Sequence, residues 1–343
     1  MSGRAGILAG GNWIVDRVKF IDTYPCQDAL ASVLSETAAN GGSPFNLLID
    51  LAKLGAHFPL LGIGLIGADA DGEWIMRTCA AHSIDTTYVG VHPTAHTSYT
   101  DVMTVQQTGR RTFFHQRGAN ALLDNEHFDF SSVNARFFHL GYLMLLDRLD
   151  GSDPDFGTIG ARTLFRAQQV GMKTSVDLVS EDSQRFPRVV LPALKHVDFC
   201  FLNEFELERT TGLKVRCYQG IDFGALQSAA ALLLEAGVRE WVFVHFPEGA
   251  CAVGRNSGLR VQGGLKIPAA QIVSSVGAGD AFAAAALYGM HERASIETVL
   301  RYGVCAAASC LFGAGASDGM RTLETCLRLE HEFGVYSFLN SML

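Results

Sequence analysis

The chain has 343 residues, of which 48% are hydrophobic and 18% are charged, and its formal net charge is −8 at pH 7. These values predict a globular protein with a sizeable core and exclude a disordered chain. The negative charge argues against general binding to nucleic acid or to anionic membranes, because there is no basic surplus to replace counterions. The longest apolar run, 281–287, is too short to span a bilayer.

The cysteines and the beginning of the chain favour a cytoplasmic protein. No C-x-x-C pair occurs, and only a short apolar run precedes Gly10, which does not resemble a secretory signal peptide. We therefore expect reduced, mostly buried thiols. The eight cysteines are at positions 26, 79, 200, 217, 251, 305, 310 and 326.

Strand and helix patterns alternate in the first third of the chain. Ser43 and Pro44 suit the N-cap and first position of a helix, and Gly55 suits its end. Residues 87–115 contain several short β-rich pieces, which predict an excursion from the main sheet. The other expected elements are strands at 5–9, 13–21 and 58–66, and helices at 26–39, 45–54 and 72–82.

The alternation resumes after residue 115 and predicts an α/β fold. Alternating strands and helices favour a largely parallel sheet that is covered on both faces. No linker and no internal repeat divides the chain, so we expect one domain over 1–343. The later strands are expected at 137–140, 173–176, 197–202 and 241–245, and the helices at 158–170, 223–236, 279–291, 296–311 and 323–332.

The glycine-rich stretch 276–280 is the strongest candidate for chemistry. Gly277 and Gly279 allow close backbone approach, and the alanine-rich run that follows predicts a helix, whose N-terminus favours a phosphate. Asp280 in this anion-friendly place suits a base that accepts the proton of an attacking hydroxyl. A glycine turn capped by Asp at the start of a core helix is an equally good interpretation.

Two further places suit a hydroxyl-rich ligand. Gly41 and Gly42 precede a helix start, and Asn46 offers both a donor and an acceptor there. Asp16, at an extended segment, could accept two hydroxyl hydrogen bonds. The alternatives are a tight turn with a surface Asn, and a surface strand residue.

Asn203 and Glu206 follow a strand, at the carboxyl end where open α/β sheets bind ligands. On a helix they share one face and suit a hydrated Mg²⁺ with phosphate oxygens. An ordinary helix-start pattern is the favoured interpretation of these two residues alone.

Two other motifs are discounted. The run 62–67 matches G-x-G-x-x-G, but its apolar spacers continue a strand, so a small-residue strand is favoured over a dinucleotide fingerprint. His92 and His96 are spaced like a zinc pair, but Pro93 between them disfavours a helix.

The order of these motifs along the chain resembles the ribokinase/PfkB family of carbohydrate and nucleoside kinases. Asp16 is followed by the Gly41-Gly42 pair with Asn46, then by Asn203 and Glu206, and then by the glycine stretch with Asp280. Segments 51–55, 66–72 and 109–113 resemble the family's connecting sequence. The similarity extends from about residue 5 to residue 316.

The resemblance implies a ribokinase-like three-layer sandwich with a mostly parallel central sheet, helices on both faces and a small β lid formed by about 13–24 and 87–115. It implies ATP and Mg²⁺, a small-molecule sugar or nucleoside substrate, and a homodimer through the lid. Asp280 matches the catalytic base, and Gly277, Ala278 and Gly279 match the anion hole. Asp16, Gly41, Gly42, Asn46 and Arg117 match acceptor contacts, while Asn203, Glu206, His245 and Gly249, with Gly277 and Gly279, match the ATP region, in which Glu206 binds Mg²⁺ through water.

Two departures from the family pattern concern the ligands. Ser274 stands where D-T-x-G-A-G-D has its first Asp, which makes the monovalent-cation site doubtful. The nucleotide loop, usually T-x-G-x-x-G, retains only Gly249 after His245, and Pro247 removes a backbone donor, so the phosphoryl donor is open.

Our hypothesis is an ATP-dependent kinase that phosphorylates a hydroxymethyl group of a sugar or sugar acid. A nucleoside kinase is the alternative within the family, kept open by Trp13, Phe45 and Phe114. A catalytically silent sugar-binding regulator is the alternative from another class, and a nicotinamide dehydrogenase is the least favoured.

Overall fold

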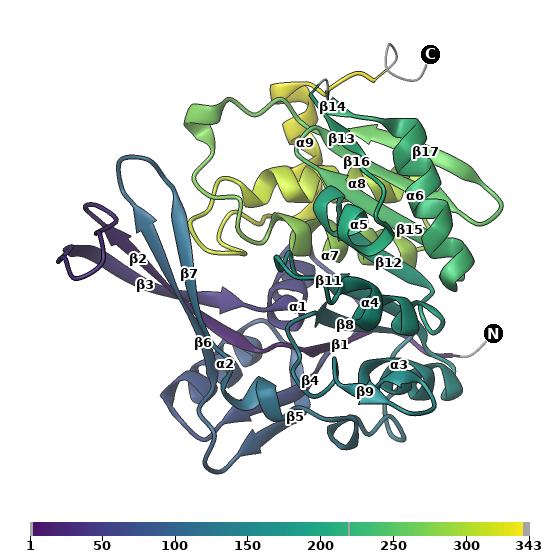
Figure 1. Ribbon diagram of the computed structural model, residues 1–343, viewed down its shortest axis with the longest axis horizontal. Helices are drawn as coiled ribbons and strands as arrows, with labels where there is room; N and C mark the ends of the chain where they lie inside the picture. The colour runs from purple at the N-terminus through teal and green to yellow at the C-terminus, as the bar shows by residue number, and fades with distance from the viewer. Residues whose placement is uncertain (1–2, 219, 339–343) are drawn as a thin grey trace.

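The computed structural model describes residues 3–218 and 220–338 of the chain. Its centre is a nine-stranded sheet in the order β17-β16-β15-β12-β11-β8-β1-β4-β5 (Figure 1). Neighbouring strands from β15 to β5 are parallel, and β16 and β17 add an antiparallel edge. The strands are β1 (Ile7–Gly11), β4 (Leu60–Gly67), β5 (Asp85–His92), β8 (Phe137–Leu143), β11 (Lys173–Leu178), β12 (Phe199–Asn203), β15 (Trp241–Phe246), β16 (Gly249–Gly254) and β17 (Gly258–Gly263).

Helices cover both faces of this sheet. Because side chains alternate along a strand, neighbouring residues enter different cores. Leu8 packs in one core with helices α3 to α6, whereas Ile7 and Ala9 pack in the other with α1, α2 and α7 to α9. The helices are α1 (Ser43–Leu54), α2 (Ala70–Ala81), α3 (Ile159–Gln169), α4 (Phe186–Leu194), α5 (Glu204–Thr211), α6 (Phe223–Ala236), α7 (Ala278–His291), α8 (Ile296–Cys310) and α9 (Leu323–Phe333). The expected three-layer arrangement, a mostly parallel sheet with helices on both faces, is confirmed.

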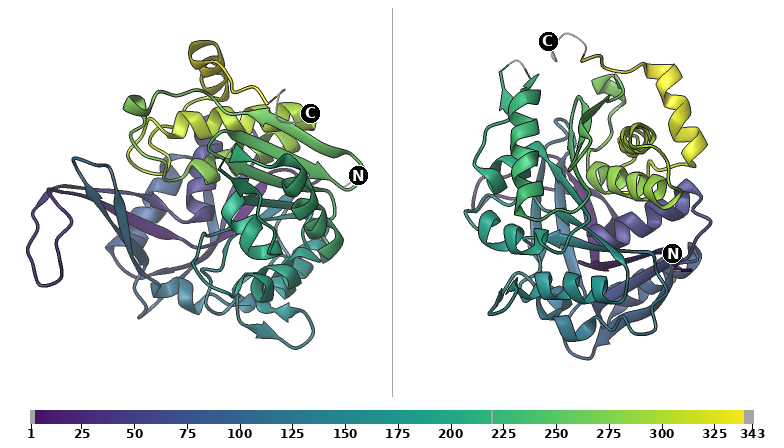
Figure 2. Two further views of the ribbon diagram at one scale, coloured as in Figure 1. Left: turned by 45° about the horizontal axis from the view of Figure 1, so that its top comes forward. Right: turned by 90° about the vertical axis from the view of Figure 1, so that its right-hand side faces the viewer.

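A separate four-stranded sheet projects from this body, on the left of Figure 1 and of the left view in Figure 2. Its order is β3-β2-β6-β7, with β2 parallel to β6 and the outer pairs antiparallel. Its strands are β2 (Ile14–Ile21), β3 (Val33–Gly41), β6 (Ser98–Val105) and β7 (Arg111–Gln116). We call it the small sheet.

The membership of the small sheet corrects two expectations. The helix expected at 26–39 is wrong, because β3 pairs with β2 over this region, and strand pairing overrides the helix-type composition. The expected lid segment 87–115 is only partly in the small sheet, because β5 pairs in parallel with β4 in the main sheet. Segment 13–24 contributes β2 to the small sheet.

The glycine run 62–67 lies within β4, as the sequence favours. The Trp13 indole packs over it, since an added Cβ would lie 2.6 Å from that ring at Gly62 and 2.4 Å at Gly64. Trp13 Nε1 donates to Ile63 O at 3.0 Å. The glycines therefore make room for a buried tryptophan, which removes the basis for the dehydrogenase interpretation.

Shorter elements complete the described part of the chain. They are the two-residue strand pairs β9 (Ser152–Asp153) with β10 (Gly157–Thr158) and β13 (Arg216–Cys217) with β14 (Gly220–Ile221), and the 3₁₀ helices Gly118–Leu122, Asn125–His127 and Ala269–Gln271. In the residues described, no helix has both the length and the apolar character needed to cross a bilayer. The cysteines in this part are unpaired, and six of the eight are buried.

Candidate active site

Asp280 lies in the first turn of α7, at the carboxyl end of the parallel strands, and is 5% exposed. Its Oδ2 accepts a hydrogen bond from Asn46 Nδ2 at 2.8 Å. The Tyr142 hydroxyl, from β8, lies 2.9 Å from Oδ1 and 2.7 Å from Oδ2. Three elements that are distant in sequence thus converge on one carboxylate.

The surroundings of Asp280 favour a proton acceptor. Loss of solvent raises the pKa of Asp280 to about 6, while hydrogen bonds from Asn46 and Tyr142 favour the ionised form and limit this rise. Burial and the neighbouring Asp280 raise the pKa of Tyr142 well above its usual range, so this hydroxyl stays a donor. A carboxylate with a pKa near neutrality is suited to general-base catalysis.

Gly277 is the N-cap of α7 and adopts a left-handed backbone, with φ of 79°. A Cβ at this position would lie 2.2 Å from the carbonyl oxygen of Ala316, so only glycine fits. The first N–H groups of a helix have no partners within the helix. The turn therefore directs the N–H groups of the first helical turn and the positive end of the helix dipole to the region beside Asp280, which can bind an anion.

The predicted acceptor residues are brought to the same place. Gly41 lies against Asp16, because an added Cβ would be 2.5 Å from that carboxyl group. Gly42 has φ of 81° and begins α1, where a Cβ would collide with Asn12 O at 2.0 Å. Gly42, rather than the expected Ser43, is therefore the N-cap.

Asp16 and Asn46 form the polar floor beside these glycines. Desolvation raises the pKa of Asp16 to about 7, a hydrogen bond from Thr100 lowers it, and the negative charge of Asp280 adds to the rise. Asn40 Nδ2 donates to Asn46 Oδ1 at 2.7 Å, which fixes the amide so that its nitrogen faces Asp280. The arrangement can accept hydroxyl hydrogen bonds next to the candidate base.

Asn203 and Glu206 form a capping box at the start of α5. Glu206 N donates to Asn203 Oδ1, and Asn203 N donates to Glu206 Oε2, both at 2.9 Å. Ser180 Oγ donates to Glu206 Oε1 at 2.8 Å. The helix-start pattern that the sequence favours is therefore present. It leaves the binding of hydrated Mg²⁺ by Glu206 open, because a carboxylate oxygen accepts more than one hydrogen bond.

A hydrated divalent cation fits the acidic groups at this edge of the sheet. Burial raises the pKa of Glu206 to about 7, and it raises the pKa of Asp177, at the end of β11, well above its usual range. The negative charges of Asp280 and Glu206 contribute to the rise at Asp177. Within 3–218 and 220–338, no three His, Cys, Asp or Glu side chains are grouped to hold a metal directly. Water-mediated Mg²⁺ binding suits this donor set.

His245 and Gly249 have different surroundings. His245, at the end of β15, faces the first turn of α7, since a Cβ at Gly279 would lie 3.2 Å from its ring, and burial lowers the pKa of His245 to about 4. Gly249 begins β16 and pairs with Phe246 across a tight turn. Arg216 forms an ion pair with Glu248 in that turn at 2.9 Å.

Arg117 is turned towards the loop after β8. Its Nη1 donates to Leu145 O at 2.9 Å and lies 3.2 Å from Asp147 Oδ1. An acceptor contact by Arg117 remains a prediction. Of the aromatic residues considered for a nucleoside, Trp13 and Phe45 are fully buried in the core, and Phe114 is half exposed on β7.

Tyr142 and Asp177 are candidate site residues that the sequence analysis missed. Each lies at the carboxyl end of a parallel strand, just beyond the predicted strands 137–140 and 173–176. Polar residues at such ends are the signal that could have identified them.

Asp50, one turn after Asn46 on α1, is fully buried, and neither carboxyl oxygen has a hydrogen-bond partner among the described residues. Burial raises the pKa of Asp50 well above its usual range, the negative charge of Asp280 adds to this rise, and the positive charge of Lys53 offsets it only in part. Asp50→Asn should therefore remove a pH-dependent loss of folding stability. As pH rises above the unfolded-state pKa, the free energy of unfolding of the wild type should fall relative to the variant by ~1.4 kcal/mol per pH unit, up to the folded-state pKa. Urea unfolding of both proteins between about pH 5 and pH 7 measures this, and parallel curves would contradict it.

Known proteins resemble this chain over most of its length. The sequence pattern of the pfkB family carbohydrate kinases matches residues 12–323. Ribokinase from Arabidopsis thaliana is 27% identical over 314 residues, which are 90% of this chain and 76% of that protein. Deoxyribokinase from Salmonella typhi is 23% identical over 96% of this chain and 98% of its own length. The structure of Arabidopsis thaliana ribokinase complexed with ribose and ATP superposes with a TM-score of 0.77 at 24% identity, covering 95% of this chain and 98% of that one.

The chain therefore belongs to the pfkB family of carbohydrate kinases. It is a phosphotransferase with an alcohol group as acceptor.

Proposed function

We propose that the protein transfers the γ-phosphoryl group of Mg·ATP to a hydroxymethyl group of a sugar or sugar acid. The observation that carries this proposal is the convergence of Asn46 and Tyr142 on Asp280, in the first turn of α7. Asp280 accepts the proton of the acceptor hydroxyl. The acceptor oxygen then forms a bond to the γ-phosphorus, the bond from phosphorus to the β–γ bridging oxygen breaks, and ADP leaves with that electron pair.

The backbone of Gly277, Ala278 and Gly279 is proposed as the anion hole for the transferring phosphoryl group. The left-handed Gly277 and the open end of α7 support this role. Asp16, Gly41, Gly42 and Asn46 would hold the acceptor hydroxyls, and closure of the small sheet over them would exclude water. The small sheet is thus the proposed lid.

ATP and Mg²⁺ are proposed as donor and cofactor. The complex of Arabidopsis thaliana ribokinase with ribose and ATP supports this choice. Asn203 and Glu206, with Asp177, would hold Mg²⁺ through water, and Mg²⁺ would neutralise phosphate charge. His245 and Gly249 are proposed to border the nucleotide.

A homodimer through the lid is also proposed. Large apolar side chains on β3 and β7 support it, since Val33, Leu34, Phe113 and Phe114 are each at least half exposed. Light scattering on the purified protein would test it, and a monomer at high concentration would contradict it.

A panel assay tests the proposed function. ADP release from Mg·ATP is measured with hexoses, pentoses, sugar acids and nucleosides as acceptors. We expect one sugar or sugar acid to stimulate ADP release strongly. If only a nucleoside stimulates ADP release, the protein is instead a nucleoside kinase of the same family. Acceptor binding in calorimetry without ADP release would support a silent regulator instead.

The ionisation of Asp280 predicts the pH dependence of turnover. Because the base must be ionised, kcat/KM should rise with pH through about 6, the pKa of Asp280. Tyr142→Phe removes a hydrogen bond that favours the ionised form, so this rise should move to higher pH. A pH profile of both proteins measures the shift, and an unchanged or lower midpoint would contradict it.

A further inference from the structure

Asn40, near the end of β3, gives both hydrogens of its side-chain amide to buried partners. Its Nδ2 donates to Asn46 Oδ1 at 2.7 Å and to Ser317 Oγ at 2.8 Å. The exposed fractions of Asn40, Asn46 and Ser317 are 7%, 2% and 0%. An amide nitrogen carries two hydrogens, so both donors are in use. Because little water reaches these groups to replace a lost bond, Asn40 holds both partners in a fixed orientation.

The bond from Asn40 decides which end of the Asn46 amide faces Asp280. The two ends of an asparagine amide are similar in size, so shape alone does not distinguish them. With Asn40 donating to Oδ1, the Asn46 nitrogen lies on the other side and donates to Asp280 Oδ2 at 2.8 Å. A reversed amide would place its oxygen against the carboxylate and its N–H group against the N–H group of Asn40. Both contacts would be repulsive, so the donor at position 40 selects the observed orientation.

The observed orientation favours the ionised form of Asp280. Burial raises the pKa of Asp280, and the hydrogen bond donated by Asn46 counteracts this rise. A carbonyl oxygen in the same place would favour the protonated acid instead. The charge state of Asp280 therefore depends on Asn40, whose side-chain hydrogen bonds within the described part of the chain go to Asn46 and Ser317.

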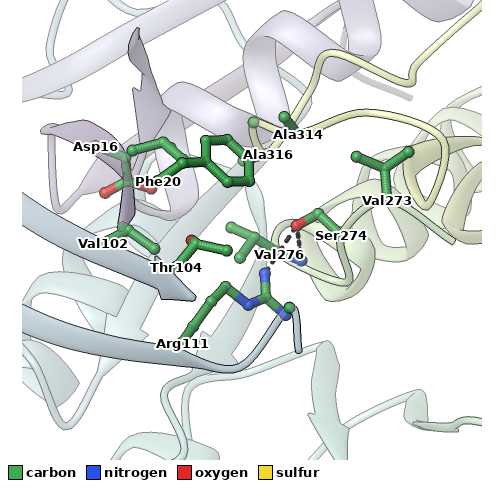
Figure 3. A pocket seen from close by; sticks show the side chains of 13 residues that line it. Asp16, Phe20, Val102, Thr104, Arg111, Val273, Ser274, Val276, Ala314 and Ala316 are labelled. Atoms are coloured by element: carbon green, nitrogen blue, oxygen red, sulfur yellow. Dashed lines mark hydrogen bonds between the residues drawn. The ribbon is translucent and has the colours of Figure 1, made fainter. Parts of the chain in front are cut away.

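The loop that carries Ser317 contacts both the small sheet and the turn at the start of α7. A Cβ at Gly315 would lie 2.7 Å from the Cβ of Ala39 in β3, and a Cβ at Gly277 would lie 2.2 Å from Ala316 O. Figure 3 shows Ala316 on the wall of the pocket beside the small sheet. The end of β3 is thus joined to the proposed anion hole by packing, and to the proposed base by the side chain of residue 40.

We propose that Asn40 is a positioning residue of the reaction, which turns the Asn46 amide so that an N–H group, and not a carbonyl oxygen, faces the base. The inference rests on the proposed function. Asn40 acts through Asn46, and the proton of the acceptor still goes to Asp280 as described above. Because Asn40 belongs to β3, two side chains connect the proposed lid with the ionisation of the base.

Several ionisable groups surround Asp280, and a neutral substitution at Asn40 leaves their charges unchanged. A shift in the pKa of Asp280 would then report the loss of hydrogen bonding and not a new charge. Burial and the negative charge of Asp280 raise the pKa of Asp16 on β2, Asp50 on α1, Tyr142 on β8, Asp177 on β11 and Cys310 on α8, while Lys53 lies near Asp50 and His245 on β15 faces the first turn of α7.

The test is the pH profile of kcat/KM for Asn40→Ala, with Ser317→Ala as its control. Without the donor at position 40, the Asn46 amide can take either orientation, so the midpoint near pH 6 should rise by about one pH unit. The value of kcat/KM should then fall close to ~10-fold at pH 5 and stay within about two-fold of the wild type at pH 8. Ser317→Ala removes the other hydrogen bond of the same nitrogen, so its midpoint should stay within about 0.3 pH unit of the wild type.

A double variant tests the route through Asn46. Asn46→Ala removes the donor to Asp280 and should itself raise the midpoint. Adding Asn40→Ala to this variant should shift the midpoint no further, because the amide that Asn40 orients is already absent. A further shift of the same size would show that Asn40 affects the base by another route, and it would overturn the inference.

Three other results would also overturn the inference. They are an unchanged midpoint in Asn40→Ala, an equal shift in Ser317→Ala, and a loss of kcat/KM that is the same at every pH. Thermal unfolding shows whether each variant is folded at the assay temperature. If Asn40→Ala is not, Asn40→Leu fills a similar volume without a donor and carries the same prediction. If the wild type releases no ADP with any acceptor, the proposed function fails, and the inference fails with it.

Discussion

Asp280→Asn is expected to lower kcat by at least ~10²-fold while the protein remains folded. The amide keeps the size of the carboxylate and can still accept a hydrogen bond from Asn46 or Tyr142, but it cannot take a proton from the acceptor. Stability should not fall, because the substitution removes a buried group whose ionisation is already disfavoured. Steady-state kinetics and thermal unfolding measure the two effects.

Asp155→Asn is the control for this substitution. The Asp155 side chain is 74% exposed and, among the described residues, pairs only with Arg162 at the surface, so its loss should leave kcat unchanged. A kcat for Asp280→Asn within about three-fold of the wild type would rule out Asp280 as the base. A large loss accompanied by unfolding would leave the base unassigned, and kinetics at a lower temperature, where the variant is folded, would then decide.

Gly277→Ala is expected to reduce kcat by ~10²-fold and to destabilise the protein. A left-handed φ of 79° costs roughly 1–2 kcal/mol for a residue with a Cβ. The Cβ would also meet Ala316 O at 2.2 Å, so the turn must move, and the N–H groups of the proposed anion hole would move with it. Kinetics at saturating acceptor and urea unfolding report the two consequences.

Gly258→Ala separates backbone strain from damage to the anion hole. Gly258 has φ of 64°, and a Cβ there would meet nothing within 4 Å. This variant should lose roughly 1–2 kcal/mol of stability and keep its kcat. Equal kcat values for the two glycine variants would contradict the importance of the turn at Gly277.

The parts of the site that lie in one sequence segment were predictable. The composition around Asp280 and the glycines before it predicts the N-terminus of α7. In the same way, the sequence at Gly41, Gly42 and Asn46 predicts the N-terminus of α1. The capping pattern of Asn203 and Glu206 was also visible. Helix starts are local structures, so local sequence specifies them.

The parts that depend on partners elsewhere in the chain were not predictable from local patterns. Residues 33–41 have a helix-type composition but form a strand because β2 is beside them. Tyr142 becomes relevant only when β8 brings its hydroxyl to Asp280, which is 138 residues later in the chain. Arg111 likewise gains its hydrogen-bond partners through the fold, since Ser274 and Ser275 lie more than 160 residues away in the chain.

The most direct test of the account is product analysis with the best acceptor and Mg·ATP, for the wild type and Asp280→Asn side by side. We expect the wild type to form ADP and phosphorylated acceptor in equal amounts, and the variant to form neither at a comparable rate. ADP without phosphorylated acceptor would mean that water receives the phosphoryl group. Equal product formation by both proteins would show that Asp280 is not the base.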